Sequence, residues 1–314
     1  MELRVLTEPQ QGATYDQQLA AAQTAEQAGF AGYFRTDHLQ REGRAAGLPG
    51  PTDAWVTLAG LARETSRLRL GSLMTCSTFR NPAHLAIMVA QVDSMSGGRV
   101  ELGLGAGSFA GEHHTLGIPW ASLQERFEQL QEQLELIRGL WATPLSELYS
   151  FEGRHYKIHD YPALAKPLQS PHPPILVGGQ GRRRSATLAA TFADEYNTDG
   201  LSAAESAEAY DRVKAACEMI GRDPATITCS AVVALCCGRD SRELARRRAV
   251  IEDKCWSDPT EILDKGAVGT PAQIVERLNT FRNAGANRIY LQLFDLLDLD
   301  HLRLVADEAM AHLA

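Results

Sequence analysis

Short apolar segments alternate along the chain with longer segments in which apolar residues recur every three or four positions. Short runs of β-branched and apolar residues are typical of buried strands, whereas the longer repeats predict helices. The sequence predicts strands at 3–7, 31–38, 67–76, 98–107, 173–181, 194–200, 226–237 and 287–294. It predicts helices at 15–29, 52–65, 82–95, 120–141, 203–221 and 271–285, with two more beginning near Arg182 and Asp298.

Repeated strand–helix units of this number close most simply into a (β/α)8 TIM barrel, an α/β fold. An open doubly wound sheet is the alternative, but the chain lacks an early GxGxxG dinucleotide fingerprint. Two segments exceed ordinary connections and are interpreted as insertions, at about 142–173 and 238–268. The first is rich in Pro and aromatic residues, so we expect it to cover part of the molecule. We expect residues 1–314 to form a single domain.

Charge and composition narrow the class of protein. The 314 residues include 31 Lys+Arg and 39 Asp+Glu, for a formal net charge of −8, and 44% are hydrophobic. This acidic balance argues against binding to nucleic acid or to an anionic membrane, which both favour a basic surface. No apolar run approaches the roughly 20 residues that cross a bilayer, and MELRVLTEPQ lacks the regions of a signal peptide. We therefore expect a cytoplasmic location, with the six cysteines reduced.

Asp37 and His38 follow the second predicted strand. In a barrel, the loops after the strands build the active site. A histidine beside a carboxylate can donate or accept a proton near neutral pH. The alternative is that Asp37 caps a helix and His38 is structural, and these residues alone leave both interpretations open.

The fourth strand ends in GLGAG (103–107), where glycines allow a ligand to approach the backbone closely. Glu112, His113 and His114 come next. Paired histidines suggest a metal, but no further set of His and Asp ligands follows the other strands, so we predict no metal site.

The segment Gly178-Gly179-Gln180-Gly181, followed by three arginines, carries the strongest signal for a ligand. Backbone N–H groups of a glycine turn, the positive end of a helix dipole and guanidinium donors coincide there, as phosphate binding requires. The alternative is a tight turn with solvated arginines. The pattern favours a phosphorylated ligand or cofactor.

Together these motifs resemble the luciferase-like (bacterial luciferase) superfamily, and within it the F420-dependent oxidoreductases. The resemblance spans nearly the whole chain. It rests on TDH (36–38), LAGLARETSRLRLGSLMTCSTFRNPAHLAIMVAQVDSMSGGRVELGLGAG (58–107), EHHTLGIP (112–119), FEGRHYKI (151–158), PHPPILVGGQGRRRSATLAATFADEYN (171–197) and VGTPAQIVERLNTFRNAGANRIYLQLF (268–294).

The resemblance implies a set of site residues. A non-prolyl cis peptide at a bulge in the third strand, here Leu73–Met74, would support the back of the cofactor ring. Asp37 would touch the polar edge of the ring, and His38 would face the substrate as the catalytic residue. The remaining cofactor-binding residues would be Gly105, Ala106, Gly107, Gly178, Gly179, Gln180, Gly181, Arg182 and Arg183.

Ser108 departs from the family pattern, because relatives carry a glutamate or a tryptophan after the GLGAG segment. Oxidation of glucose 6-phosphate is therefore not expected, and a bulkier substrate has room. Ser108 and His113 are assigned to the substrate pocket.

We expect an enzyme that transfers a hydride between coenzyme F420 and a small organic substrate. The first alternative is an FMN-dependent monooxygenase that receives reduced flavin from a partner reductase. The second is a flavin-binding barrel without catalysis. The resemblance also implies a homodimer, for which helix 82–95 could supply a face, although a buried core helix has the same apolar pattern.

Overall fold

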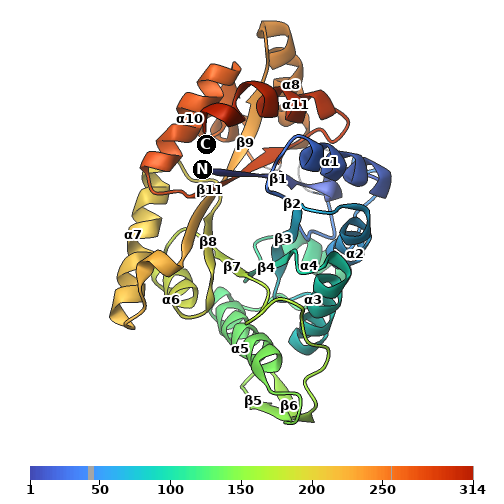
Figure 1. The fold of residues 1–314 in the computed structure, drawn as a ribbon, viewed down its shortest axis with the longest axis vertical. Helices are drawn as coiled ribbons and strands as arrows, with labels where there is room; N and C mark the ends of the chain where they lie inside the picture. Colours follow the sequence, from blue (N-terminus) through green and yellow to red (C-terminus); the bar gives the residue numbers. More distant parts are fainter. Residues whose placement is uncertain (42–45, 256, 314) are drawn as a thin grey trace.

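The barrel draws its strands from the whole length of the chain. The computed structural model describes residues 1–41, 46–255 and 257–313, and in these residues eight parallel strands close into a barrel (Figure 1). The strands are β1 Glu2–Thr7, β2 Gly32–Arg35, β3 Arg69–Cys76, β4 Val100–Gly105, β7 Ile175–Gly178, β8 Glu195–Thr198, β9 Thr228–Cys237 and β11 Arg288–Leu293. Pairing of β11 with β1 and of β9 with both β8 and β11 completes the ring. The predicted (β/α)8 fold is confirmed.

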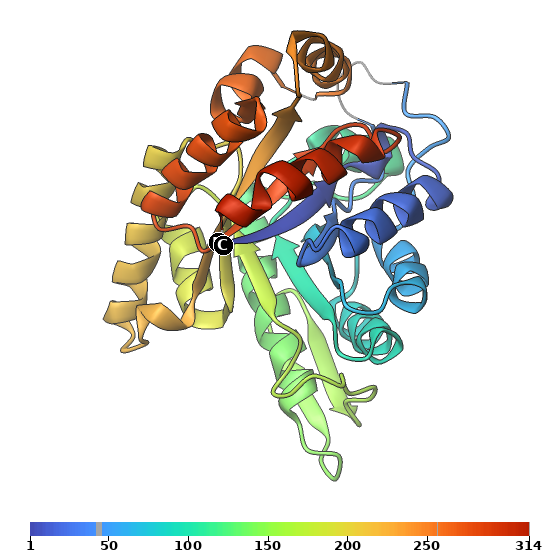
Figure 2. The same ribbon diagram turned by 45° about the horizontal axis from the view of Figure 1, so that its top comes forward.

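Helices surround the strands (Figure 2). Capping residues set where several of these helices begin. The outer helices are α1 Tyr15–Gln27, α2 Ala54–Glu64, α3 Pro82–Ser96, α5 Leu123–Ala142, α6 Arg183–Phe192, α7 Ala203–Met219, α10 Pro271–Asn283 and α11 Leu299–Glu308. The predicted helices at 52–65 and 120–141 start later, because Asp53 and Ser122 accept backbone N–H bonds as N-caps. Among the described residues, no helix is both long enough and apolar enough to span a bilayer.

The first insertion is a β-hairpin packed along α5. Its strands are β5 Tyr149–Glu152 and β6 Lys157–Tyr161 (Figure 1). The carboxylate of Glu132 on α5 accepts N–H groups of the hairpin turn, at 2.8 Å from Arg154 and 2.9 Å from His155. No residue of this insertion lines the main cavity, so it covers α5 rather than the site.

The second insertion is largely helical. It contains α8 Ser241–Lys254, α9 Pro259–Lys265 and the short strand β10 Ala267–Gly269, which pairs with β9 outside the ring. The sequence did not predict the short helix α4 Ala110–Leu116 or the 3₁₀ turns η1 Pro9–Gln11, η2 Pro224–Thr226 and η3 Met310–His312.

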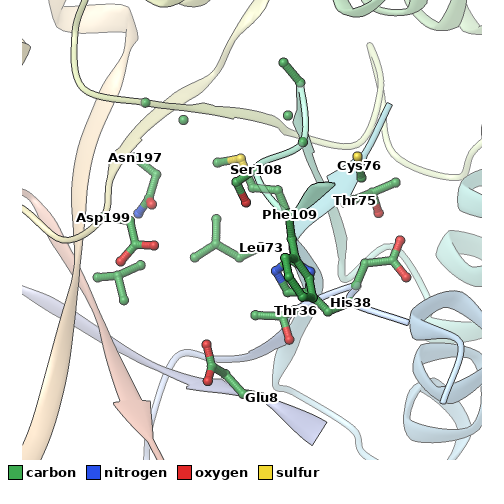
Figure 3. Close-up of a pocket in the computed structure, with 18 of the residues that line it drawn as sticks. Glu8, Thr36, His38, Leu73, Thr75, Cys76, Ser108, Phe109, Asn197 and Asp199 are labelled. Carbon is green, nitrogen blue, oxygen red and sulfur yellow. The ribbon is translucent and has the colours of Figure 1, made fainter. Parts of the chain in front are cut away.

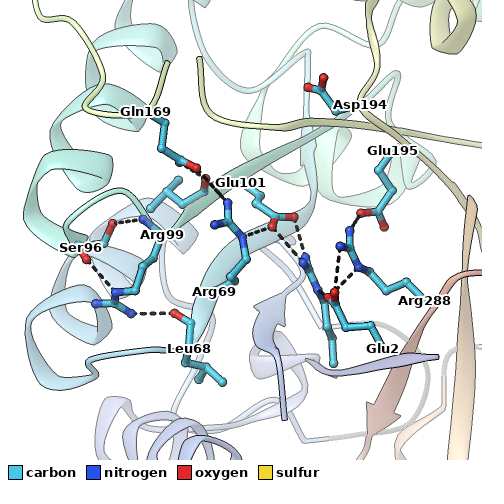
Figure 4. Close-up of polar contacts among 12 residues, drawn as sticks. Glu2, Leu68, Arg69, Ser96, Arg99, Glu101, Gln169, Asp194, Glu195 and Arg288 are labelled. Carbon is cyan, nitrogen blue, oxygen red and sulfur yellow. Dashed lines mark hydrogen bonds and ion pairs between the residues drawn. The ribbon is translucent and has the colours of Figure 1, made fainter. Parts of the chain in front are cut away.

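Two layers of side chains fill the barrel interior below the carboxyl ends of the strands. The lower layer is a buried charge network at the amino ends, in which Arg4 and Arg69 contact Glu101, and Arg288 contacts Glu2 and Glu195 (Figure 4). The layer above it is apolar and consists of Leu6, Phe34, Leu73, Leu176, Val232 and Tyr290. These layers form the closed base beneath the candidate site.

Candidate active site

A cavity of about 1000 Å³ opens at the carboxyl ends of the barrel strands (Figure 3). This is where (β/α)8 enzymes place their active sites. The volume is at the upper end of the range for small-molecule sites, about 300–1000 Å³, which leaves room for a cofactor and a second molecule. The lining residues are Leu6, Glu8, Thr36, Asp37, His38, Gln40, Arg41, Leu73, Met74, Thr75, Cys76, Gly105, Ala106, Gly107, Ser108, Phe109, Glu112, Leu123, Phe127, Gly178, Gly179, Gln180, Asn197, Asp199, Val232 and Gln292.

The floor of the cavity is a bulge in β3. The peptide bond between Leu73 and Met74 is cis, as expected from the sequence. The pairing of β3 with β4 shifts register between Ser72 and Thr75. The hydroxyl of Thr75 donates to the hydroxyl of Ser72 at 2.9 Å, which ties the two ends of the bulge together. The bulge brings Leu73 and Met74 into the cavity lining.

His38 is held by a carboxylate that the sequence analysis did not assign to it. Its Nδ1 lies 3.0 Å from Oε1 of Glu112, and Oε2 of Glu112 accepts the backbone N–H of Leu39 at 3.0 Å. Because an ionised carboxylate can only accept, Nδ1 of His38 carries a proton in this pair. The side chain of Glu112 is 1% exposed and that of His38 24%. The sequence carries only a weak signal for this pair, a glutamate that closely follows the glycine-rich end of the fourth strand.

Asp37 lines the cavity and is anchored from behind by an arginine. Arg80 makes two hydrogen bonds with its carboxylate, one of them 3.0 Å long, and also contacts Asp53. Burial raises the pKa of Asp37, although the charge of Arg80 opposes this shift. Asp53, and not Asp37, caps the helix that follows, so the capping alternative for Asp37 is wrong.

His113 does not belong to the substrate pocket, and that assignment is corrected. The residue is 0% exposed and is not among the lining residues. Its Nδ1 lies 2.9 Å from the carbonyl oxygen of Phe109, and its Nε2 contacts the hydroxyl of Thr78. The ring also stacks on Phe79. Because the helical turn directs His113 into the protein, only Ser108 of the two assigned residues reaches the cavity.

The glycine turn after β7 lies partly in the cavity and partly beside it. Gly178, Gly179 and Gln180 line the cavity, whereas Gly181, Arg182 and Arg183 lie outside the lining, where α6 begins. Gly179 and Gly181 have φ angles of 151° and 66°, which favour glycine. The arginine side chains are exposed. The first N–H groups of a helix have no partner within it, so this end can receive an anion.

Arg212 is a second residue that sequence reasoning missed. It lies on α7, and its Nε donates to the carbonyl oxygen of Gly181 at 3.0 Å. A Cβ at Gly181 would lie 2.6 Å from Cα of Ala209 on the same helix. Helix α7 therefore packs against the turn and adds a cation next to it.

Cys76 lines the cavity but has the surroundings of a structural thiol. Its Sγ lies 2.8 Å from the hydroxyl of Thr78. Burial raises the pKa of Cys76, so the thiol form is favoured. Among the residues that the structure describes, no three His, Cys, Asp or Glu side chains gather closely enough to hold a metal ion.

Comparison with known proteins gives consistent results. A family model described as luciferase-like monooxygenase matches residues 1–257. The chain is 34% identical over 222 residues to an F420-dependent hydroxymycolic acid dehydrogenase of Mycobacterium tuberculosis, covering 68% of this chain and 56% of that protein. It is 28% identical over 244 residues to an FMNH(2)-dependent dimethylsulfone monooxygenase of Pseudomonas putida, covering 67% and 65%. The matched part thus spans less than two thirds of either relative.

The fold is shared with solved structures. An F420-dependent secondary alcohol dehydrogenase in complex with an F420–acetone adduct superposes with a TM-score of 0.85. The sequence identity is 18%, and the superposition covers 99% of this chain and 98% of the other. At this identity the match concerns the fold.

Proposed function

The chain belongs to the luciferase-like monooxygenase family, and from this premise we propose that it transfers a hydride between coenzyme F420 and a small organic substrate. The observation that carries the proposal is the His38–Glu112 pair at the edge of a large cavity with a bulged apolar floor. The relative that uses F420 is 34% identical and the FMNH(2)-dependent one 28%. This difference supports F420 as the cofactor.

The residues of the cavity fit a ring with a phosphorylated side chain. A Cβ at Gly105 would meet only Met74, at 3.4 Å from Sδ, so the glycine leaves open the space that a ring needs. Leu73 and Met74 would support the ring, and Asp37 would contact its polar edge. The turn from Gly178 to Gly181, with Arg182, Arg183 and Arg212, would hold the phosphate.

Coenzyme F420 is a deazaflavin, and when bound it would supply or accept the hydride. The protein's own contribution is to exclude water, position the two reactants and move a proton. When His38 is protonated, Nε2 holds a proton that it can pass to a substrate oxygen or nitrogen. Glu112 stabilises the imidazolium and keeps the ring in one orientation.

Equilibrium titration of the purified chain with F420 and with FMN, followed by fluorescence, tests the cofactor. We expect F420 to bind at least tenfold more tightly than FMN. If the chain bound neither F420 nor FMN tightly, the proposal would be overturned. Once a substrate is found, His38→Ala should bind cofactor normally and turn over slowly, and unchanged turnover would remove the proton-transfer role.

The FMN-dependent relative supports a second candidate, a monooxygenase supplied with reduced flavin by a partner reductase. This candidate predicts that the chain binds reduced FMN tightly. It also predicts that oxygen is consumed only when substrate is present. A cavity that binds cofactor but reoxidises it no faster than buffer would instead favour a non-catalytic barrel.

A homodimer remains part of the proposal. In helix α3, which was expected to supply a face, Leu85, Val89 and Val92 are buried within the monomer. Only the side with His84, Ile87 and Met88 lines a surface groove, and light scattering of the purified chain will give its mass in solution.

A further inference from the structure

The side of the cavity opposite His38 carries negative charge. Figure 3 shows Asp199 and Asn197 across the cavity from His38, with Glu8 between the two sides. Asp199 follows β8, and its side chain is exposed to the cavity. Glu8 follows β1, and its Oε1 accepts a hydrogen bond of 3.0 Å from Gln292. Two carboxylates therefore face the same part of the space.

Two other carboxylates of the lining have cationic or ionisable partners. Asp37 is paired with Arg80, and Glu112 with His38. Arg41 is the one Lys or Arg in the lining formed by the described residues, and its side chain packs beside Gly47 on the loop after β2.

Asp199 makes no salt bridge with any residue that the structure describes. Asp199 is open to the cavity, but the protein packed around its carboxylate disfavours the charged form and raises its pKa, which a hydrogen bond from the N–H of Gly200 and the charge of His38 oppose. A carboxylate in such a site gains most from a cation that a ligand brings to it. An anion, in contrast, would be repelled there. The cofactor phosphate has the arginine-rich turn at Arg182 and Arg183, so the space beside Asp199 remains for the substrate.

We propose that the substrate presents a protonated nitrogen, an amine or an iminium, to Asp199. This inference shares one assumption with the proposed function, namely that the substrate binds in this cavity. Asp199 is then a residue that determines specificity. It selects cationic substrates over neutral ones of the same shape.

Matched pairs of ligands test the proposal by binding. Benzylamine and benzyl alcohol have nearly the same shape and differ in charge. We expect the chain, alone and loaded with F420, to bind the amine at least tenfold more tightly than the alcohol in ligand-observed NMR titrations. Asp199→Asn should weaken amine binding about tenfold and change alcohol binding less than twofold.

The variants separate charge from structure. Asn at position 199 can still accept the N–H of Gly200, so a merely structural role would not alter amine binding. Asp199→Ser also removes the charge and should show the same loss. Asp253→Asn, on the exposed face of α8, is the matched control and should bind both ligands as the parent does.

Equal binding of amine and alcohol, or amine binding that both Asp199 variants retain, would overturn the inference. The cofactor titration is independent of this result. If the chain bound the amine through Asp199 but did not bind F420, the inference would be supported and the proposed function rejected. If the chain bound F420 but did not prefer the amine, the proposed function would be supported and the inference rejected.

Discussion

Oε1 of Glu112 lies 3.0 Å from Nδ1 of His38, although 74 residues separate them in the sequence. The second oxygen of Glu112 accepts the backbone N–H of Leu39 at 3.0 Å. One carboxylate thus fixes both the ring of His38 and the backbone that carries it. Helix α4, which supplies Glu112, thereby orients the group expected to move the proton.

We predict that Glu112→Ala lowers the free energy of unfolding by about 1–3 kcal/mol, because it leaves partly buried donors without a partner. Glu112→Gln should cost less, since its amide oxygen can still accept one of the two bonds. Urea denaturation measures both, and ring ¹⁵N shifts show whether the proton leaves Nδ1 of His38. His114→Ala, on an exposed side of the same helix, is the control. A Glu112→Ala variant as stable as the parent would contradict this role.

The charge network at the barrel base predicts a pH-dependent contribution to stability. Burial raises the pKa of Glu101, but Arg4, Arg69 and Arg288 lower it more, and the net shift is downward. A lowered pKa in the folded state means that the stabilisation is fully present above the unfolded value of about 4.3 and is lost as the pH falls through the folded value.

Glu101→Gln should therefore cost roughly 3–5 kcal/mol near pH 7, where it leaves a buried arginine without its carboxylate. The difference from the parent should shrink below about pH 4. Denaturant titrations at several pH values measure it, with the exposed Glu218→Gln as control. A cost that does not change with pH would refute this account of the network.

Local signals in the sequence predicted the barrel well. Asn81 caps α3 and Pro82 occupies its first turn, as the expected start at 82 requires. Gly97, with a φ of 71°, ends the same helix. Short runs of apolar residues located the strands, because a strand inside a parallel barrel is buried on both faces.

The site itself depended on contacts that no local pattern encodes. Glu112 lies 74 positions after His38, and Arg212 reaches Gly181 from a helix 31 residues further along the chain. His113 was expected in the pocket, but the sequence does not show that residues 110–116 form a helix or which of its faces turns inward. Adjacent residues on a helix point in different directions, so Glu112 lines the cavity while His113 does not, although both are buried.

We predict that Arg182→Ala combined with Arg183→Ala weakens cofactor binding about tenfold or more, because charge-assisted bonds to phosphate contribute roughly 1.5–3 kcal/mol. The affinity of the parent should fall with added salt more steeply than that of the double variant. Fluorescence titration measures both. The exposed Arg242→Ala on α8 controls for general loss of charge. Unchanged affinity of the double variant would place the phosphate elsewhere.

Gly178 and Met74 provide the most direct test of where the ring lies. A Cβ at Gly178 would lie 2.4 Å from Cε of Met74, which is the flexible end of a side chain on the cavity floor. Gly178→Ala should therefore move Met74 rather than the backbone, and the free energy of unfolding should change by only about 1 kcal/mol. Cofactor affinity should fall about tenfold, because the displaced thioether occupies space that the ring needs.

Met74→Ala in the Gly178→Ala background removes the displaced side chain and should recover part of the lost affinity, so the two substitutions are not additive. A double-mutant cycle measures this effect. The parent, both single variants and the double variant are each titrated with the same cofactor. If Gly178→Ala bound cofactor as the parent does, the ring would not lie against Met74, and the assignment of the β3 bulge as its support would be wrong.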